Sequence, residues 1–133
     1  MATKPKTRAG GEMTETITIE LPLPDRKLSP NARTHYMAKA RATRKSRYEA
    51  GMVASSERLP SCPWNSAKVQ FIFTFRDKRA RDRDNLLSQC KATIDGIADS
   101  GIVVNDSQMT FLPVEITEPN SKRPGMVIVI TSE

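Results

Sequence analysis

Two aspartates spaced two residues apart, with a third further along the chain, are the residues best suited to chemistry. Asp82 and Asp84 lie in the run Arg81-Asp82-Arg83-Asp84-Asn85-Leu86-Leu87, and Asp106 follows Asn105. Carboxylate oxygens are ligands that Mg²⁺ prefers, and two or three of them leave positions for waters and a substrate phosphate oxygen. The set therefore predicts a hard divalent cation beside a phosphate, with Mg²⁺ as the expected ion and Mn²⁺ as its substitute.

The alternative role for either aspartate of the pair is structural. Both precede a predicted helix. One carboxylate would cap the first turn, and the other would interact favourably with the positive end of the helix dipole. Inside a helix the two side chains would diverge by roughly 200°, so they can share one ion only in the extended or capping backbone before the first turn. For one aspartate alone the cap is the favoured interpretation, whereas the second acid and Asp106 favour a metal site.

The other residue types in the chain limit the reactions that the site could catalyse. The only histidine is His35, which excludes a site with several histidine ligands. Metal-assisted attack of water on a phosphodiester remains. Lys91 and Ser88 follow Asp84 by seven and four residues, on one face of a continuous helix, and Lys91 could reach the scissile phosphate as a point charge. An i,i+4 pair of Lys91 with Asp95 explains the same spacing equally well.

The chain is strongly basic, with 21 Lys and Arg against 15 Asp and Glu and a net charge of +6. Its positive side chains form two groups, at 39–47 and 76–83, and the second runs directly into the aspartate pair. A polyanion is the expected partner, and a basic surface that serves solubility is the alternative. Phosphate contacts are expected from these residues: Lys39, Arg41, Arg44, Arg76, Lys78, Arg79, Arg81 and Arg83.

Length and composition predict one domain. Residues 1–14 are expected to be a disordered tail, and the domain to span residues 15–133 of the 133-residue chain. The longest apolar run, Met126 to Ile130, is too short to cross a membrane, and the first residues lack the apolar core of a secretory signal. We therefore expect a cytoplasmic protein. Cys62 and Cys90 are expected to be reduced structural thiols rather than zinc ligands.

Hydrophobic periodicity predicts six elements in the order β-α-β-α-β-β. Alternation predicts strands at 16–21 and 68–75, a third at Leu112, Val114 and Ile116, and a last one at 126–131. Helices are expected at about 35–58 and over an apolar stripe from Leu86 to Ile97. The fold class is therefore α+β, a single domain with two helices on a mixed sheet, and Pro113 predicts an edge position or a bulge for the third strand.

Several motifs, taken together, resemble a known family. The blocks are Arg-Asp-x-Asp-Asn-Leu at 81–86, Lys-Ala-x-x-Asp-Gly-Ile at 91–97, Ser100-Gly101, the turn at 105–108, and Ser29-Pro30-Asn31 followed by His35. Over residues 16–131 the chain resembles the RusA family of Holliday-junction resolvases. The resemblance implies a small α/β homodimer that uses Mg²⁺ to nick opposed strands of four-way DNA junctions symmetrically, in DNA recombination and repair.

The resemblance also implies roles for individual residues. Asp82, Asp84 and Asp106 would be the catalytic and metal-binding carboxylates, Lys91 would take the role of the family's lysine, and Asn31 would belong to a DNA-binding loop. Two positions depart from the family pattern. Asn105 stands where the family often has another aspartate. The family's lysine can lie one helical turn closer to the aspartate pair than Lys91 does.

A homodimer has a physical reason, because two opposed cuts need two sites related by a two-fold axis. Phe111, Leu112 and the run 102–104 are candidate dimer residues, with core packing as their alternative role. Two other functions fit part of the sequence. One is a non-enzymatic DNA- or RNA-binding protein in which Asp82 and Asp84 only cap a helix, and the other is a Mg²⁺-dependent transferase, for which the chain is short.

Overall fold

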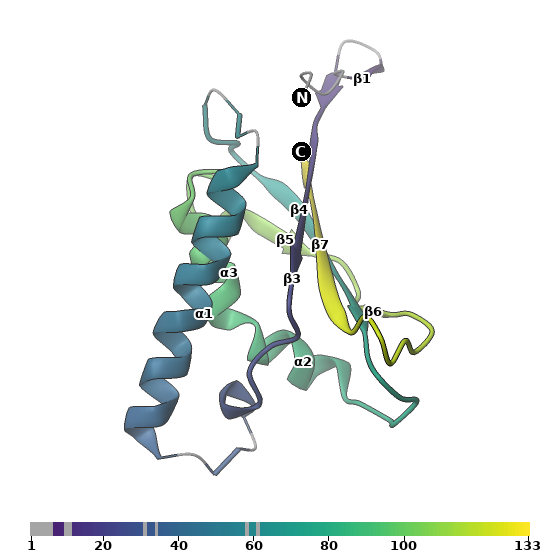
Figure 1. Ribbon diagram of the computed structural model, residues 1–133. Coiled ribbons are helices and arrows are strands. Elements are labelled where there is room, and N and C mark those ends of the chain that lie inside the picture. Colours follow the sequence, from purple (N-terminus) through teal and green to yellow (C-terminus); the bar gives the residue numbers. More distant parts are fainter. Residues whose placement is uncertain (1–6, 10–11, 31, 34, 58, 61) are drawn as a thin grey trace.

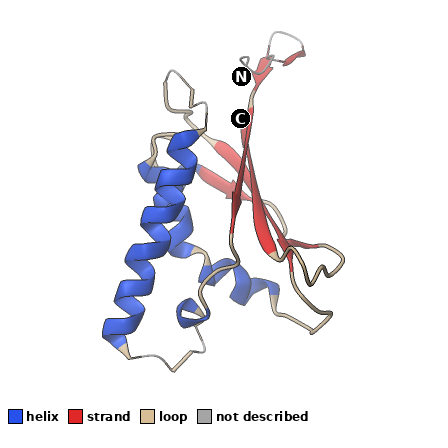
Figure 2. Cartoon of the chain, in the orientation of Figure 1, coloured by secondary structure: helices blue, strands red, loops and turns tan. Residues whose placement is uncertain are grey.

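A mixed sheet carries the main helices on one of its faces (Figure 1). The computed structural model describes residues 7–9, 12–30, 32–33, 35–57, 59–60 and 62–133, and the side chains of 7–9, 12–14 and 106 lie outside that description. Helices and strands occupy separate layers (Figure 2), as expected for the predicted α+β class. No helix among the described residues is long and apolar enough to span a membrane.

The last strand of the chain lies inside the sheet. β7 (Gly125–Ser132) runs antiparallel to both of its neighbours, β3 (Thr16–Leu21) and β4 (Ala67–Thr74). β4 then pairs in parallel with two short strands at the edge, β5 (Met109–Phe111) and β6 (Glu115–Ile116). The strand order is therefore β3-β7-β4, with β5 and β6 following each other along the outer side of β4.

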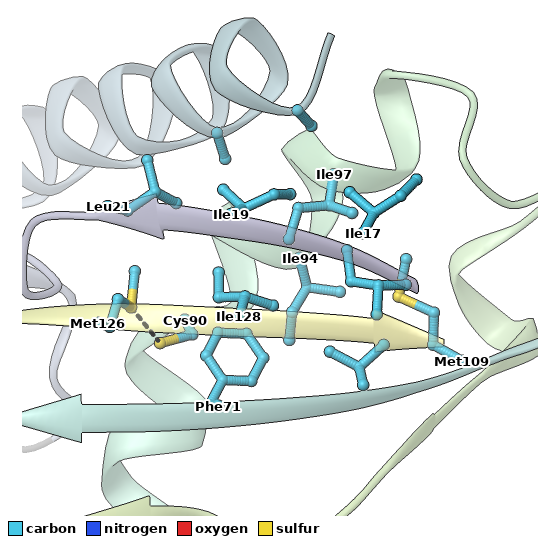
Figure 3. Close-up of a cluster of buried hydrophobic side chains, with 14 of the residues drawn as sticks. Ile17, Ile19, Leu21, Phe71, Cys90, Ile94, Ile97, Met109, Met126 and Ile128 are labelled. Atoms are coloured by element: carbon cyan, nitrogen blue, oxygen red, sulfur yellow. Dashed lines mark hydrogen bonds between the residues drawn. The ribbon is translucent and has the colours of Figure 1, made fainter. Parts of the chain in front are cut away.

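Alternating apolar residues of the three long strands build the core. In β4 the buried side chains include Val69, Phe71 and Phe73, and Ile128 of β7 lies opposite Phe71. Figure 3 shows how these strands meet the helices, with Cys90 Sγ 4.0 Å from Met126 Sδ. Phe71, Phe73 and Phe75 are packing residues, as their alternation predicts.

Two helices pack closely on the sheet through small residues. α1 (Tyr36–Ser56) buries Ala42, Ala50 and Ala54, and it lies against α3 (Lys91–Asp99). A Cβ atom built on Gly96 of α3 would collide with the backbone carbonyl of Arg47, because the two helices approach so closely there. The Arg47 side chain also binds Asp99 through two contacts, of 2.6 and 2.9 Å. This guanidinium lowers the pKa of the Asp99 carboxyl.

The second predicted helix is broken, which corrects the expectation of one helix from Leu86 to Ile97. α2 (Arg83–Gln89) ends at Cys90, whose dihedral angles of φ −93° and ψ 9° start α3 in a new direction. The Cys90 amide bonds to the Leu87 carbonyl at 3.0 Å, three residues back, which tightens the last turn of α2. After α3, Gly101 adopts φ +90°, the left-handed conformation of a glycine that follows a helix.

The third predicted strand, from Leu112 to Ile116, needs correction, because only Glu115 and Ile116 of it are in a strand and β5 lies before the predicted segment. β5 and β6 are separated by Leu112 to Val114, and Pro113 in this interruption has no N–H to donate to a sheet. The predicted edge position is confirmed. Within the predicted tail, β1 (Thr7–Ala9) pairs with β2 (Glu12–Thr14) as a short antiparallel hairpin, so these residues have secondary structure that the composition did not indicate.

Candidate functional site

Asp82 and Asp84 stand at the start of α2, on the carboxyl-terminal side of β4. Asp82 is the N-cap: its Oδ1 accepts the backbone N–H groups of Asp84 at 2.9 Å and Asn85 at 3.3 Å. The capping role predicted as the structural alternative is thus present. It uses one oxygen of Asp82 and leaves Oδ2, while Asp84 lies in the first turn with its carboxylate exposed. Capping and metal binding are therefore compatible in this backbone.

The arginines beside the pair have other partners. Arg81 stacks its guanidinium 3.8 Å from the ring centroid of Phe75 and binds Asp77 at 3.0 Å. Arg83 donates from Nε to the Val114 carbonyl at 3.2 Å. Among the described residues neither Asp82 nor Asp84 forms an ion pair. Two carboxylates in a basic chain are thus left without a cationic partner in the part of the chain that the structure describes.

Asp77 is the acid that neutralises this loop. Its carboxylate accepts the Arg79 backbone N–H at 3.0 Å and pairs with the guanidinium groups of Arg79 and Arg81. The Arg79 amide, followed by the Arg81 side chain, lowers the pKa of Asp77. The loop from Phe75 to Asp82 is therefore held in shape by its own charges, and Asp77 is a structural acid rather than part of the aspartate pair.

The backbone of Asp106 lies toward the other end of β4. It begins a short 3-10 helix (Asp106–Gln108) directly before β5, whose first residue pairs with Ala67 at the start of β4. The aspartate pair instead adjoins Val114, eight residues later along the edge, so the two places are on the order of 20 Å apart. Figure 1 shows the start of α2 and the start of β5 at opposite ends of the sheet.

The side chain of Asp106 is outside the described residues. Among the described side chains no group of three or more His, Cys, Asp or Glu residues is close enough to hold a metal. One chain thus brings Asp82 and Asp84 together and does not place the backbone of Asp106 beside them.

Lys91 forms the i,i+4 pair that the sequence left open. Its Nζ lies 2.7 Å from Asp95 Oδ1. Because the helix breaks at Cys90, the periodicity that put Lys91 on the helical face of Asp84 does not hold. Lys91 instead shares a hollow with Ser88 and Lys39, between α1 and the junction of α2 with α3.

The other predicted phosphate contacts divide into two surfaces. Arg41 and Arg44 are exposed on α1, near Tyr48 and Met52, which are 68% and 56% exposed. The exposed residues of the 75–82 loop form the second surface: Arg76, Lys78 and Arg79. Arg81 is largely committed to Phe75 and Asp77, and Asn31 lies outside the described residues.

Several sequence candidates are packing residues. Ile102 and Val103 are buried, and Phe111 packs against the core, whereas Val104 and Leu112 are exposed. Cys90 is buried in the core, and desolvation raises the pKa of its thiol to about 12. Cys62 is exposed, so the two cysteines, both unbridged, are in different environments.

Comparisons with known proteins leave the function open. No protein-family model matches the chain. It is 29% identical over 124 residues to an uncharacterized protein of Xylella fastidiosa (strain Temecula1 / ATCC 700964). That alignment covers 91% of this chain and 78% of the relative.

Proposed function

We propose that this protein is a Mg²⁺-dependent endodeoxyribonuclease that cuts four-way DNA junctions, as its resemblance to the RusA family implies. One observation carries the proposal: Asp82 and Asp84 are exposed at the start of α2 without a cationic partner among the described residues, although an arginine precedes each in the chain. Two carboxylates two residues apart would favour a divalent cation that neutralises both.

The donor chemistry of the pair fits Mg²⁺. Asp82 is held by its cap and keeps Oδ2 for a cation, and Asp84 is exposed. A bound Mg²⁺ would lower the pKa of a coordinated water and offset charge that builds up on the phosphodiester. The protein's contribution would be to hold the Asp82 carboxylate by its cap and to place Asp84 in the first helical turn after it.

The position of Asp106 supports a site that is shared between two subunits. In one chain its backbone lies toward the end of β4 opposite to the pair. A two-fold axis through the middle of the β5–β6 edge would exchange these ends and bring Asp106 of a second copy toward Asp82 and Asp84. Leu112, which is 36% exposed between β5 and β6, would lie close to that axis. The homodimer would then supply both the paired cuts and the complete carboxylate set.

The exposed arginines and lysines would hold the DNA by its phosphates. Arg41 and Arg44 on α1, together with Arg76, Lys78 and Arg79 in the 75–82 loop, are available for such contacts. Contacts of this kind position DNA without reading its sequence. Binding should therefore weaken steeply as the salt concentration rises.

A comparison of DNA substrates tests the proposal. A labelled synthetic four-way junction and a linear duplex of the same arm sequence are incubated with the protein in Mg²⁺ and, separately, in chelator. Symmetric nicks in opposed strands of the junction, dependent on Mg²⁺ and lacking in the duplex, are the expected result. Binding of both substrates without any nick would contradict the proposal.

That last outcome would favour a second candidate, a non-enzymatic DNA- or RNA-binding protein. The observation in its favour is the Asp82 cap itself, since a capping aspartate needs no metal to explain it. This candidate explains the basic surfaces equally well. The helix dipole also accounts for Asp84 in the first turn, so cleavage is the property that distinguishes the two candidates.

A further inference from the structure

A groove lies between the segment after β3, the loop after β4 and α2. Its apolar floor includes Leu23, Phe75 and Leu86, and arginines stand around it. Arg81 and Leu86 line the groove and flank Asp82 and Asp84 in sequence. The groove therefore lies along α2, the helix whose first turn carries the aspartate pair.

The charges around the groove are unbalanced. Arg26, Arg76, Arg79 and Arg81 line it together with a single carboxylate, that of Asp77. Asp77 pairs with Arg79 and Arg81, and among the described residues no acid pairs with Arg26 or Arg76, which are both exposed. An anion is the complementary ligand for this rim.

The floor adds a requirement for a flat apolar group. Arg81 lies over the Phe75 ring, 3.8 Å from its centroid, so a guanidinium plane forms part of the wall next to Leu23 and Leu86. Nucleobases stack on aromatic rings and on arginine planes, and they do so without strong sequence preference. A ligand with a flat ring and an attached negative charge matches both the floor and the rim.

We propose that this groove holds one unpaired nucleotide of branched DNA, with its base on the apolar floor and its phosphate toward Arg26 and Arg76. The inference rests on the proposed function for the identity of the strand. A branch point offers nucleotides that leave the stack at low cost, whereas a base inside a duplex must first be unstacked and unpaired. The groove would thus favour branched over linear DNA without reading bases.

The competing place for an unstacked base is the outer surface of α1. Tyr36 and Tyr48 are 75% and 68% exposed there, and Arg41 and Arg44 lie on the same helix. Neither tyrosine lines the groove, and both stand on an exposed helix surface. The groove and the α1 tyrosines are far enough apart in sequence to be separated by peptide mapping.

Photocrosslinking distinguishes the two places. A four-way junction that carries 4-thiothymidine at its branch point is irradiated with the full-length protein in chelator, so that the DNA stays intact. The crosslinked peptides are identified by mass spectrometry. Crosslinks on residues 23–26 or 75–81 are expected, and crosslinks confined to residues 36–52, or none at all, would overturn the inference.

Two variants and a matched control make the assignment specific. Leu23→Trp fills the floor, and Arg76→Glu reverses a rim charge at an exposed position that does not endanger folding. Each should lower the crosslink yield by roughly ten-fold, the scale of one lost base stack. Lys122→Glu makes the same charge reversal at an exposed position in the turn before β7, which does not line the groove, and should change the yield less than about two-fold. An unchanged yield in both groove variants would overturn the inference.

The nick assay of the wild-type protein in Mg²⁺ keeps the two proposals separate. If junctions are nicked and the crosslinks are confined to α1, the proposed nuclease function is supported and the proposed nucleotide site is wrong. If crosslinks form in the groove and no nicks form in Mg²⁺, the nucleotide site is supported and the proposed nuclease function is wrong.

Discussion

The Oδ1 atom of Asp82 accepts the backbone N–H of Asp84 at 2.9 Å, so one member of the acidic pair orders the other. The same oxygen reaches the Asn85 amide, which makes Asp82 the cap of α2. Asparagine caps helices about as well as aspartate, whereas alanine does not. Substitution of Asp82 by asparagine removes its charge and keeps the cap, whereas substitution by alanine removes both.

We predict that Asp82→Ala lowers the free energy of unfolding by about 1 kcal/mol and that Asp82→Asn changes it far less. Urea unfolding followed by circular dichroism measures both. Both variants should lose junction cleavage, because each removes a metal-binding carboxylate. Equal destabilisation by the two variants would show that the cap contributes little.

The close approach of α1 and α3 gives a second prediction. Gly96→Ala places a methyl group against the Arg47 carbonyl and the Ala50 side chain, so the helices must separate. The variant should lose about 2 kcal/mol of stability. Gly51→Ala is the matched control, since its Cβ would lie 3.3 Å from the Gly96 carbonyl oxygen and needs only a small adjustment. Similar stability of the two variants in urea would contradict this packing.

The two cysteines should differ in reactivity. Cys62 is exposed and should react with a thiol reagent at once, whereas Cys90 should react only after unfolding. Burial raises the pKa of Cys90 from 9.0 to about 12. The unfolded chain therefore loses this proton first, and the contribution of Cys90 to stability should decline as the pH rises from 9 toward 12. Two fast-reacting thiols in the native protein would refute the assignment, and Cys62→Ser should remove the fast phase.

Mixed dimers test whether the acidic site is shared between subunits. One chain carries Asp82→Asn with Asp84→Asn, and the other carries Asp106→Asn. If Asp106 serves the pair of its partner, each mixed dimer has one site with every substitution and one intact site. Mixing the two inactive variants should then restore single-strand nicking. If all three acids act within one chain, both sites stay damaged and the mixture remains inactive.

Much of the fold follows from the sequence, because alternation and helix propensity are local signals. The pattern of Ile17, Ile19 and Leu21 and that of Val69, Phe71 and Phe73 predicted β3 and β4 nearly to the residue. The insertion of β7 between these strands is a long-range pairing that no local pattern records. The break at Cys90 was missed for a similar reason, since the apolar spacing from Leu86 to Ile97 is helical on both sides of it.

The candidate site was less accessible to sequence reasoning. The aspartate pair and its alternative capping role were both predicted, and the cap is present in the structure. What the sequence could not show is the direction of Arg81 and Arg83, which turn to Phe75 and Val114 instead of to the acids. Leu23 and Arg26 were not singled out, because the groove that they line forms only when the segment after β3 meets the loop after β4.

Single-turnover cleavage of a four-way junction by the wild-type protein and by Asp84→Asn tests the central claim most directly. The substitution keeps the size of an exposed side chain, and the cap contact uses the backbone N–H of Asp84, so folding should be preserved. We predict Mg²⁺-dependent cleavage by the wild type and a loss of at least about a hundred-fold in the variant, with junction binding kept or tightened. Cleavage by Asp84→Asn at the wild-type rate, or wild-type cleavage that persists in chelator, would contradict the account.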